Sequence, residues 1–353
     1  MTPSLSALHP ASTPVASHTA TTVLGPVPAH ELGVVSVHEA LLSVVPGAQY
    51  APDITMDRAG IFDVLASKLR DFHRHGGRTI VDSTGMFHGR DVKLYEALSR
   101  ATGVHIIAST GMGPEDTLGG YFLTPQTNPP TPWPAERFAE LFSKEITEGM
   151  VVPRVERRGR PGLVTTTADR NGMTPTEESL FRGAARTALN TGAPLSIRFG
   201  SDAMHDLDVV LDEQLPAGRV LVGGLDRKDA GGAAVEIAQR GAFVGLDHVG
   251  RNDSPHYLND HQRAELVLEL VKRGHVDRII LSSNSVGVAK GHPGDSGQDG
   301  DSGHDGDSGH DGHDLPFSYV LSTFVPLLKA KGLSEQDAQR ILVDNPRELL
   351  THS

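Results

Sequence analysis

The sequence predicts an α/β fold, a single (β/α)8 TIM barrel. Short apolar segments rich in β-branched residues recur eight times along the 353-residue chain. The spacing between most of them leaves room for a helix, which is typical of βα units and not of hairpins. Eight such units in about 300 residues match the size of a barrel of this kind. These observations together favour one barrel over two separate domains.

The expected strands follow from these segments in order. They cover residues 33–39, 78–84, 104–110, 162–168, 194–200, 219–226, 243–250 and 278–284. Between them, segments such as 60–77 and 135–150 place apolar residues three and four positions apart and often end near Gly, which predicts helices. The segment 174–192 begins with a capping box, in which Thr174 is the N-cap and Glu177 lies three residues later.

Two segments fall outside the barrel pattern. Residues 1–22 are rich in Ser, Thr, Ala and Pro and lack the basic start and apolar middle of a secretory signal, so we expect a disordered tail on a cytoplasmic protein. The barrel then covers residues 23–353. Within it, residues 291–314 form an Asp/Gly/His repeat, which predicts a mobile loop over the mouth of the barrel. Its histidines beside Asp could bind divalent metal weakly, but a solvated repeat expansion is the favoured interpretation.

Composition excludes several classes of function. The chain has no Cys, which removes thiolate catalysis, Cys-based zinc sites and iron–sulfur clusters. The formal net charge is −12, and the repeat supplies seven of the negative charges. The rest of the chain is still acidic, so it gives no sign of a nucleic-acid-binding face. No apolar run approaches the roughly 18 residues that span a bilayer. We therefore expect no nucleic acid and no membrane among the partners.

Active sites of such barrels lie at the carboxyl ends of the strands. The polar side chains expected there are His38, Glu39, Asp82, Ser109, Thr110, Thr165, Arg198, Asp226, Asp247, His248, Asn284 and Ser285. A single Asp at a strand end is more often a helix cap than a catalyst. A ring with several His, Asp and Arg side chains nevertheless predicts a pocket for a small-molecule ligand.

Several segments in order resemble the phosphotriesterase family of the amidohydrolase superfamily. They include TVLGPV before the first strand, GGRTIVDST, TPTEESLFRGAARTALNTGAPLS, GLDHVG and ILVDNPRELL. The resemblance extends from about residue 22 to residue 350. It implies a barrel and a binuclear metal hydrolase, in which two divalent ions lower the pKa of a bridging water and polarise an ester or lactone.

The resemblance implies six metal-ligand positions, and most of them do not hold a metal-binding residue in this chain. Of the His-x-His pair on the first strand, His38 remains. The other five positions hold Ala40, Thr165, Arg198, Gly224 and Ser285. Ala, Gly and Thr do not replace an imidazole or a carbamate, and Arg198 would repel a dication. We therefore expect no metal at this site and no other cofactor.

The resemblance also implies a relay from a seventh-strand His to a sixth-strand Asp, which match His248 and Asp226. An Asp that orients an imidazole sets up a general acid/base without metal, although the same pair could be a structural hydrogen bond in the barrel wall. Arg198 is the candidate clamp for a carboxylate or phosphate, with an ion pair filling the vacated volume as the alternative. The remaining candidates for substrate binding are His38, Thr165, Asn284 and Ser285, and for His38 a structural role is favoured.

The sequence leaves three functions open. The first is a metal-independent hydrolase or lyase-type enzyme that acts on a small polar or anionic metabolite, with His248 and Asp226 catalytic and Arg198 binding the anion. The second is a pseudoenzyme that binds a small molecule or a protein partner. The third is a conventional zinc-dependent phosphotriesterase or lactonase. The sequence does not settle whether the protein is a homodimer.

Overall fold

The computed structural model describes residues 18–118, 123–124, 131–152, 155–291 and 315–351. Its central feature is a nine-stranded parallel sheet in the order β14-β13-β12-β11-β10-β5-β4-β3-β15. β14 (Ile279–Leu281) pairs with β13, and β15 (Val286–Lys290) pairs with β3. Because β14 and β15 are two parts of one chain segment, they together form the eighth strand and close the barrel.

The other seven barrel strands lie where the sequence predicts them. They are β3 (Val34–Val44), β4 (Gly77–Asp82), β5 (His105–Met112), β10 (Leu163–Thr167), β11 (Leu195–Arg198), β12 (Val220–Gly223) and β13 (Phe243–Leu246). The predicted α/β barrel is therefore confirmed. Short hairpins add β1 (Thr19–Thr22) with β2 (Gly25–Pro28), β6 (Leu123–Thr124) with β7 (Thr131–Pro132), and β8 (Met150–Val151) with β9 (Arg157–Arg158).

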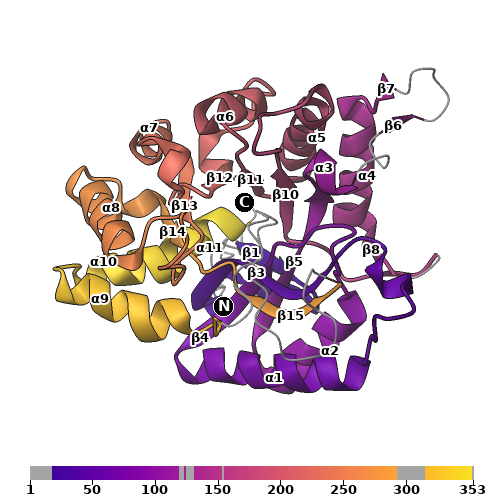
Figure 1. Ribbon diagram of the computed structural model, residues 1–353, viewed down its shortest axis with the longest axis horizontal. Coiled ribbons are helices and arrows are strands. Elements are labelled where there is room, and N and C mark those ends of the chain that lie inside the picture. Colours follow the sequence, from indigo (N-terminus) through magenta and orange to yellow (C-terminus); the bar gives the residue numbers. More distant parts are fainter. Residues whose placement is uncertain (1–17, 119–122, 125–130, 153–154, 292–314, 352–353) are drawn as a thin grey trace, which may run out of the picture.

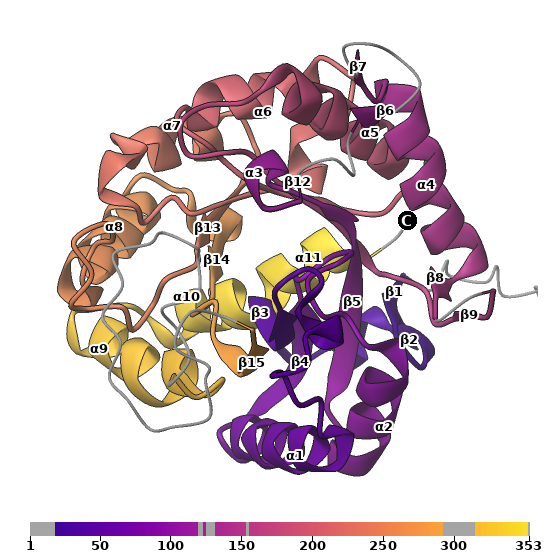
Figure 2. The ribbon, with the colours of Figure 1, turned by 45° about the vertical axis from the view of Figure 1, so that its right-hand side comes forward.

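Helices surround the barrel on its outside, as Figures 1 and 2 show. Those that follow the strands are α1 (Arg58–Arg74), α2 (Val92–Thr102), α3 (Glu115–Leu118), α4 (Ala135–Glu148), α5 (Pro175–Thr191), α6 (Ala203–Leu211), α7 (Ala233–Gln239) and α8 (Asp260–Lys272). The chain ends with α9 (Val325–Ala330), α10 (Glu335–Gln339) and α11 (Asn345–Leu350). The capping box predicted at Thr174 and Glu177 is present at the start of α5. No helix among the described residues is long and apolar enough to cross a membrane.

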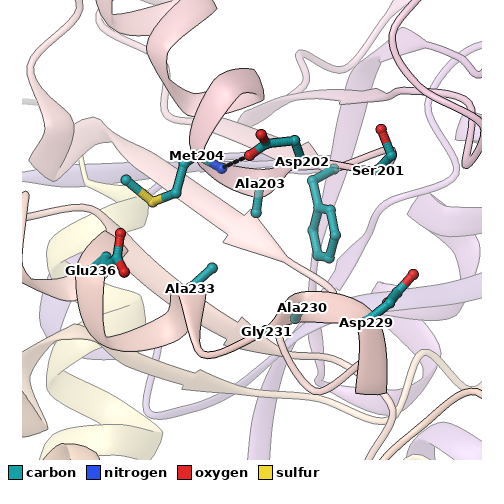
Figure 3. Close-up of a pocket in the computed structure, with 10 residues that line it drawn as sticks. Ser201, Asp202, Ala203, Met204, Asp229, Ala230, Gly231, Ala233 and Glu236 are labelled. Carbon is teal, nitrogen blue, oxygen red and sulfur yellow. Dashed lines mark hydrogen bonds between the residues drawn. The ribbon is translucent and has the colours of Figure 1, made fainter.

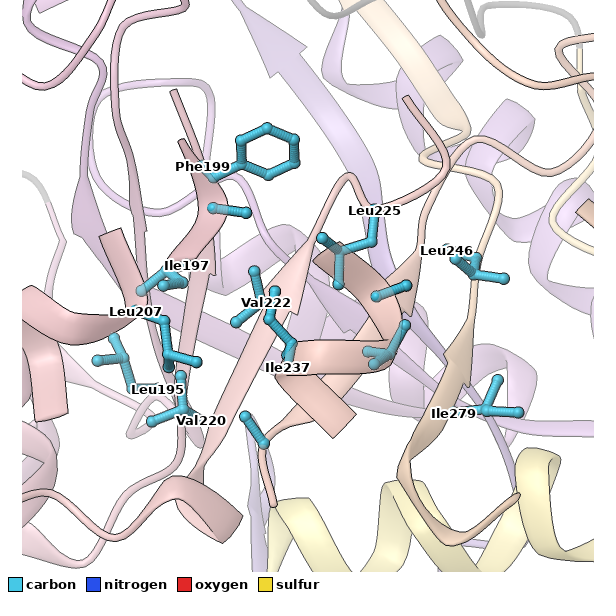
Figure 4. Close-up of a cluster of buried hydrophobic side chains, with 14 of the residues drawn as sticks. Leu195, Ile197, Phe199, Leu207, Val220, Val222, Leu225, Ile237, Leu246 and Ile279 are labelled. Atoms are coloured by element: carbon cyan, nitrogen blue, oxygen red, sulfur yellow. The ribbon is translucent and has the colours of Figure 1, made fainter. Parts of the chain in front are cut away.

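Apolar side chains pack in two layers. One lies between the strands and the outer helices, where Ile197 and Val222 contact the same cluster as Leu207 of α6 and Ile237 of α7 (Figure 4). The other fills one end of the barrel interior with side chains from most strands, namely Val35, Val37, Val81, Ile107, Leu163, Leu221, Phe243 and Ile280. Since this end is apolar and filled, the polar residues that face inward gather toward the carboxyl ends of the strands.

The predicted domain boundary at the N-terminus is wrong by a few residues. Residues 19–22 form β1 and are not part of a disordered tail. Ala20 is fully buried in the same apolar cluster as Leu349 and Leu350 of α11. Strand pairing and burial of Ala20 outweigh the Ser/Thr-rich composition of this segment. Residues 1–17 lie outside the described residues.

The eighth strand also differs from the prediction. The sequence places the repeat directly after a single strand that ends at residue 284. Instead the strand breaks near Asn284, whose φ is 47°, and continues as β15 up to Lys290. Of the repeat itself only Gly291 is described, so its predicted mobility and its position over the mouth stay predictions.

Candidate functional site

Three of the predicted residues meet at the carboxyl ends of β11, β12 and β13. His248 Nδ1 lies 2.7 Å from Asp226 Oδ1, and Arg198 Nη2 lies 3.0 Å from His248 Nε2. Arg198 is the last residue of β11, whereas Asp226 and His248 follow β12 and β13. Parallel neighbouring strands bring these side chains together because their carboxyl ends lie at one rim of the barrel.

Asp226 is the anchor of this group. It is fully buried, and besides the imidazole it accepts hydrogen bonds from the backbone N–H of His248 and from Arg263 Nε, at 2.9 and 2.7 Å. Arg263 belongs to α8, is also fully buried, and pairs in addition with Asp260. Burial alone would raise the pKa of Asp226, but the interactions with His248 and Arg263 outweigh it and hold that pKa well below its ordinary value.

His248 is a neutral imidazole at pH 7. Burial lowers its pKa to about 4, and the charges of Arg198 and Arg251 add to this effect while Asp226 opposes it. A guanidinium can only donate hydrogen bonds, so Nε2 is the acceptor and the proton sits on Nδ1, which donates to Asp226. The lone pair of Nε2 therefore faces Arg198.

Tyr257 fixes the plane of the imidazole. Its ring stacks on that of His248, with centroids 3.8 Å apart and an interplanar angle of 18°. Arg170 donates to the Tyr257 hydroxyl at 2.7 Å, and the guanidinium of Arg251 lies 5.9 Å from the Tyr257 ring centroid. The aromatic pair is thus bordered by positive side chains from the loops that follow β10 and β13.

His38 belongs to a second polar group, deeper in the barrel. Its Nε2 contacts Ser196 Oγ on β11, and its Nδ1 lies 2.8 Å from Asp247 Oδ2. Gly223 makes room for this group, because a Cβ there would lie 2.2 Å from Asp247 Oδ2. The order Ser–His–Asp matches that of hydrolytic triads. However, Ser196 and Asp247 are fully buried and His38 is 2% exposed, so here the group ties β3 to β11 and β13 across the barrel.

Glu39 holds the broken eighth strand. Its carboxylate accepts hydrogen bonds from the backbone N–H groups of Ser283 and Ser285, at 3.2 and 2.6 Å, and from the Ser36 hydroxyl at 2.7 Å. Burial raises the pKa of Glu39 to about 7. This predicted strand-end residue is therefore part of the barrel closure between β3 and β14–β15.

The other predicted substrate-binding residues make contacts outside the group formed by Arg198, His248 and Asp226. Thr165 is 6% exposed and pairs in register with Ser196 and Gly111. The carbonyl of Asn284 accepts a hydrogen bond from Arg251 at 3.1 Å. Ser285 is fully buried, and its hydroxyl has no hydrogen-bond partner among the residues that the structure describes. None of the described contacts of Thr165 or Ser285 reaches Arg198 or His248, so their predicted role stays a prediction.

A separate cavity of about 230 Å³ lies beside this rim (Figure 3). Its lining includes Phe199 and the carboxylates of Asp202, Asp229 and Glu236, between the loops that follow β11 and β12. Asp202 caps α6 through the backbone N–H of Met204, and Asp229 pairs with Arg227. Two of the three carboxylates therefore have structural partners, and the cavity does not include Arg198, Asp226 or His248.

Comparison with known proteins decides the family. The sequence profile of the phosphotriesterase family matches residues 18–350. The chain belongs to the phosphotriesterase family. It is 24% identical over 334 residues to the phosphotriesterase homology protein of Mycobacterium tuberculosis, covering 93% of this chain and 96% of that protein. It is 26% identical over 298 residues to the aryldialkylphosphatase of Saccharolobus solfataricus, covering 82% of this chain and 86% of that protein.

Solved structures agree on the fold. A phosphotriesterase-like lactonase mutant from Deinococcus radiodurans superposes with a TM-score of 0.76 at 22% identity, covering 94% of this chain and all of that one. The phosphotriesterase-family relatives support a hydrolase-like function for this chain.

The binuclear metal centre that the family resemblance implies does not fit the residues present. Arg198 is a permanent cation at a position to which the resemblance assigns a ligand, and it contacts His248, while His38 contacts Ser196 and Asp247. Within the described part of the chain, no three His, Asp or Glu side chains gather as a metal-binding group. The chemistry of this site is therefore derived from its own side chains.

Sequence reasoning missed several residues of the site, including Arg170 and Arg251. Tyr257 and Ser196 carry no recognisable signal, because loop position and strand alternation alone do not reveal what they touch. Arg263 does carry one, since it shares a helix face with the buried residues Val267 and Leu270. A charged residue on an apolar helix face indicates a buried ion pair.

Proposed function

We propose that this phosphotriesterase-family protein is a metal-independent hydrolase or lyase-type enzyme for a small anionic metabolite. The hydrogen-bonded series Arg198–His248–Asp226 at the barrel rim is the observation that carries the proposal. It combines an anion-binding group, a neutral imidazole and a carboxylate that orients the imidazole. These are the parts that proton transfer without metal requires.

In this proposal His248 is a general base. Its Nε2 takes a proton from water or from an acidic carbon of the substrate, and the positive charge that forms on the ring is stabilised by Asp226. With a pKa of about 4 for His248, the proton then passes readily to the leaving group. Arg198 binds an anionic group of the substrate through its planar fork.

The experiment is a screen of carboxylate, phosphate and sulfonate esters and amides with the wild type and with His248→Gln. We expect a drop in kcat of roughly 10²–10⁴-fold in the variant. A matched control is His261→Gln on α8, which leaves the barrel rim unchanged. Binding without turnover of any compound would favour the pseudoenzyme, the alternative function.

Metal content separates the proposal from a zinc-dependent hydrolase. In protein that lacks residues 291–314, which removes the His and Asp of the repeat, elemental analysis should find less than one tightly bound ion per chain. Two zinc ions per chain, with activity lost to a chelator, would establish the zinc enzyme instead. A cytoplasmic location stays a prediction, and light scattering would show whether the protein is a monomer or a homodimer.

A further inference from the structure

Both ring nitrogens of His248 are occupied. Nδ1 is bound to Asp226, and Nε2, the nitrogen that a base would use, accepts from Arg198 Nη2 at 3.0 Å. A guanidinium does not give up its proton at physiological pH, so nothing can be transferred between these two groups. As long as the contact persists, it occupies the lone pair that the base would use.

The side chains that bind the two nitrogens of the imidazole differ in how freely they can move. Asp226 and Arg263 are both fully buried, and Asp226 accepts hydrogen bonds from Arg263 Nε and from the backbone N–H of His248. Arg198 is only partly buried, and in the described part of the chain its one side-chain hydrogen bond is to His248. Arg198 is thus the partner that can move, and its remaining N–H groups are donors that a ligand can use.

An imidazole nitrogen is a neutral acceptor, and an anion is a stronger one. A hydrogen bond from a guanidinium to an anionic oxygen gains the attraction of opposite charges and can be bidentate, and a neutral imidazole nitrogen offers neither. A carboxylate, phosphate or sulfonate that reaches Arg198 will therefore compete with Nε2 for the guanidinium. A neutral ester or lactone offers no such competition.

We propose that Arg198 caps the base in the free protein and that an anionic group of the substrate removes the cap. This inference rests on the proposed function in that it takes His248 as the base. It restricts the substrate class to molecules whose anionic group lies close to the bond that reacts. The anionic group then binds Arg198 while the reacting part of the molecule contacts Nε2. Neutral organophosphates and simple lactones fall outside this class.

The test follows Nε2 directly by NMR of protein with ¹⁵N-labelled histidine, with the His248 signal assigned from His248→Gln. Inorganic phosphate is the probe, and it is added in place of chloride so that the ionic strength stays constant. The pH is also held constant. We expect the Nε2 resonance to shift as phosphate saturates the site and the hydrogen bond from Arg198 is lost. In Arg198→Met the Nε2 resonance should lie, even without phosphate, where it lies when no hydrogen bond from Arg198 is made. Added phosphate should not shift it.

A matched control is Arg240→Met, a surface residue that pairs with Asp208 and should leave the response intact. The inference is overturned if phosphate leaves the wild-type resonance unmoved, or if it moves equally in Arg198→Met. Should Arg198→Met fold poorly, Arg198→Lys replaces it, because Lys keeps the charge but lacks the planar fork and should weaken the response.

Failure of this inference is distinguishable from failure of the proposed function. A phosphate-insensitive resonance together with turnover that is lost in His248→Gln rejects the cap and keeps the base. A resonance that responds as expected, with turnover unchanged in His248→Gln, keeps the cap and rejects His248 as the base.

Discussion

The chemistry of His248 is decided by opposing effects on one side chain. Asp226 favours the charged imidazole, whereas burial and two neighbouring arginines favour the neutral one. The neutral form predominates at pH 7, because the pKa of His248 falls from 6.5 to about 4. A shift of this size corresponds to about 3 kcal/mol, so the imidazole is neutral at pH 7 although it is paired with Asp226.

Asp226→Asn should destabilise the fold strongly. The substitution keeps the shape but leaves Arg263 with only Asp260 as a carboxylate partner, inside the protein. Breaking a buried pair costs about 3–5 kcal/mol, and we expect the lower end because Asp260 remains. Urea unfolding measures this loss.

The control is Asp229→Asn, which breaks the pair of Arg227 with an Asp229 side chain that is 61% exposed. Solvent screening limits its cost to about 1 kcal/mol or less. Equal losses in the two variants would show that Asp226 does not carry a buried charge.

At the scale of elements, the join between β3 and the eighth strand is held by a carboxyl group with a raised pKa. Glu39 binds the backbone at Ser283 and Ser285, which flank Asn284 within the break between β14 and β15. Closing a barrel through a broken strand leaves backbone N–H groups without strand partners, and Glu39 supplies an acceptor for two of them.

This carboxyl predicts an unusual dependence of stability on pH. The pKa of Glu39 is raised from 4.5 to about 7, so its contribution is fully present below pH 4.5 and is lost as the pH rises through 7. The pKa of His248 is lowered, so its contribution is fully present above pH 6.5 and is lost as the pH falls through 4. Between pH 4.5 and 6.5 the two effects oppose each other, which flattens the curve.

Glu39→Gln should remove the first effect, because Gln resembles the protonated form. The free energy of unfolding of the variant should then rise more steeply than that of the wild type between pH 4.5 and 7, by about 3 kcal/mol in total. Urea unfolding at four pH values across this range provides the measurement. Parallel curves for the two proteins would mean that Glu39 does not titrate in this window.

At the scale of the whole molecule, the barrel has an apolar end and a polar end. β1 and α11, from opposite ends of the chain, supply Ala20, Leu349 and Leu350 to the apolar end. The polar side chains then lie at the opposite rim, where parallel strands present their carboxyl ends. This arrangement leaves the carboxyl-terminal rim to the polar side chains, of which some stabilise the fold and others are candidates for chemistry.

Ala20→Asp tests whether β1 belongs to the barrel. A carboxylate there would enter a closed apolar cluster, and we expect a loss of several kcal/mol or a protonated, strongly shifted Asp. Thr19→Asp, at a partly exposed position of the same strand, should change the free energy of unfolding by at most about 0.5 kcal/mol. Thermal unfolding of both variants measures this difference. Equal melting temperatures would mean that residues 19–22 are not part of the folded barrel.

Much of the fold could be predicted because its signals are local. The alternation of apolar segments with helical periodicity predicts the eight strands, and the Thr174–Glu177 capping box predicts the start of α5. The break at Asn284 and the strand β1 could not be predicted in this way, because Glu39 binds the backbone at the break and Ala20 of β1 is buried against α11, and both partners are remote in sequence.

The sequence by itself determined the barrel, the family, and the residue types at the positions where the resemblance expects metal ligands, since each depends on local pattern or on position along the chain. Only the tertiary structure decided what those residues touch. Arg198 caps Nε2 of His248, Arg263 neutralises Asp226, and Tyr257 stacks on the imidazole because side chains from β11, α8 and the loop after β13 converge at one rim. Charge, burial and hydrogen-bond direction at that rim depend on distances between residues far apart in the chain, and no local pattern encodes them.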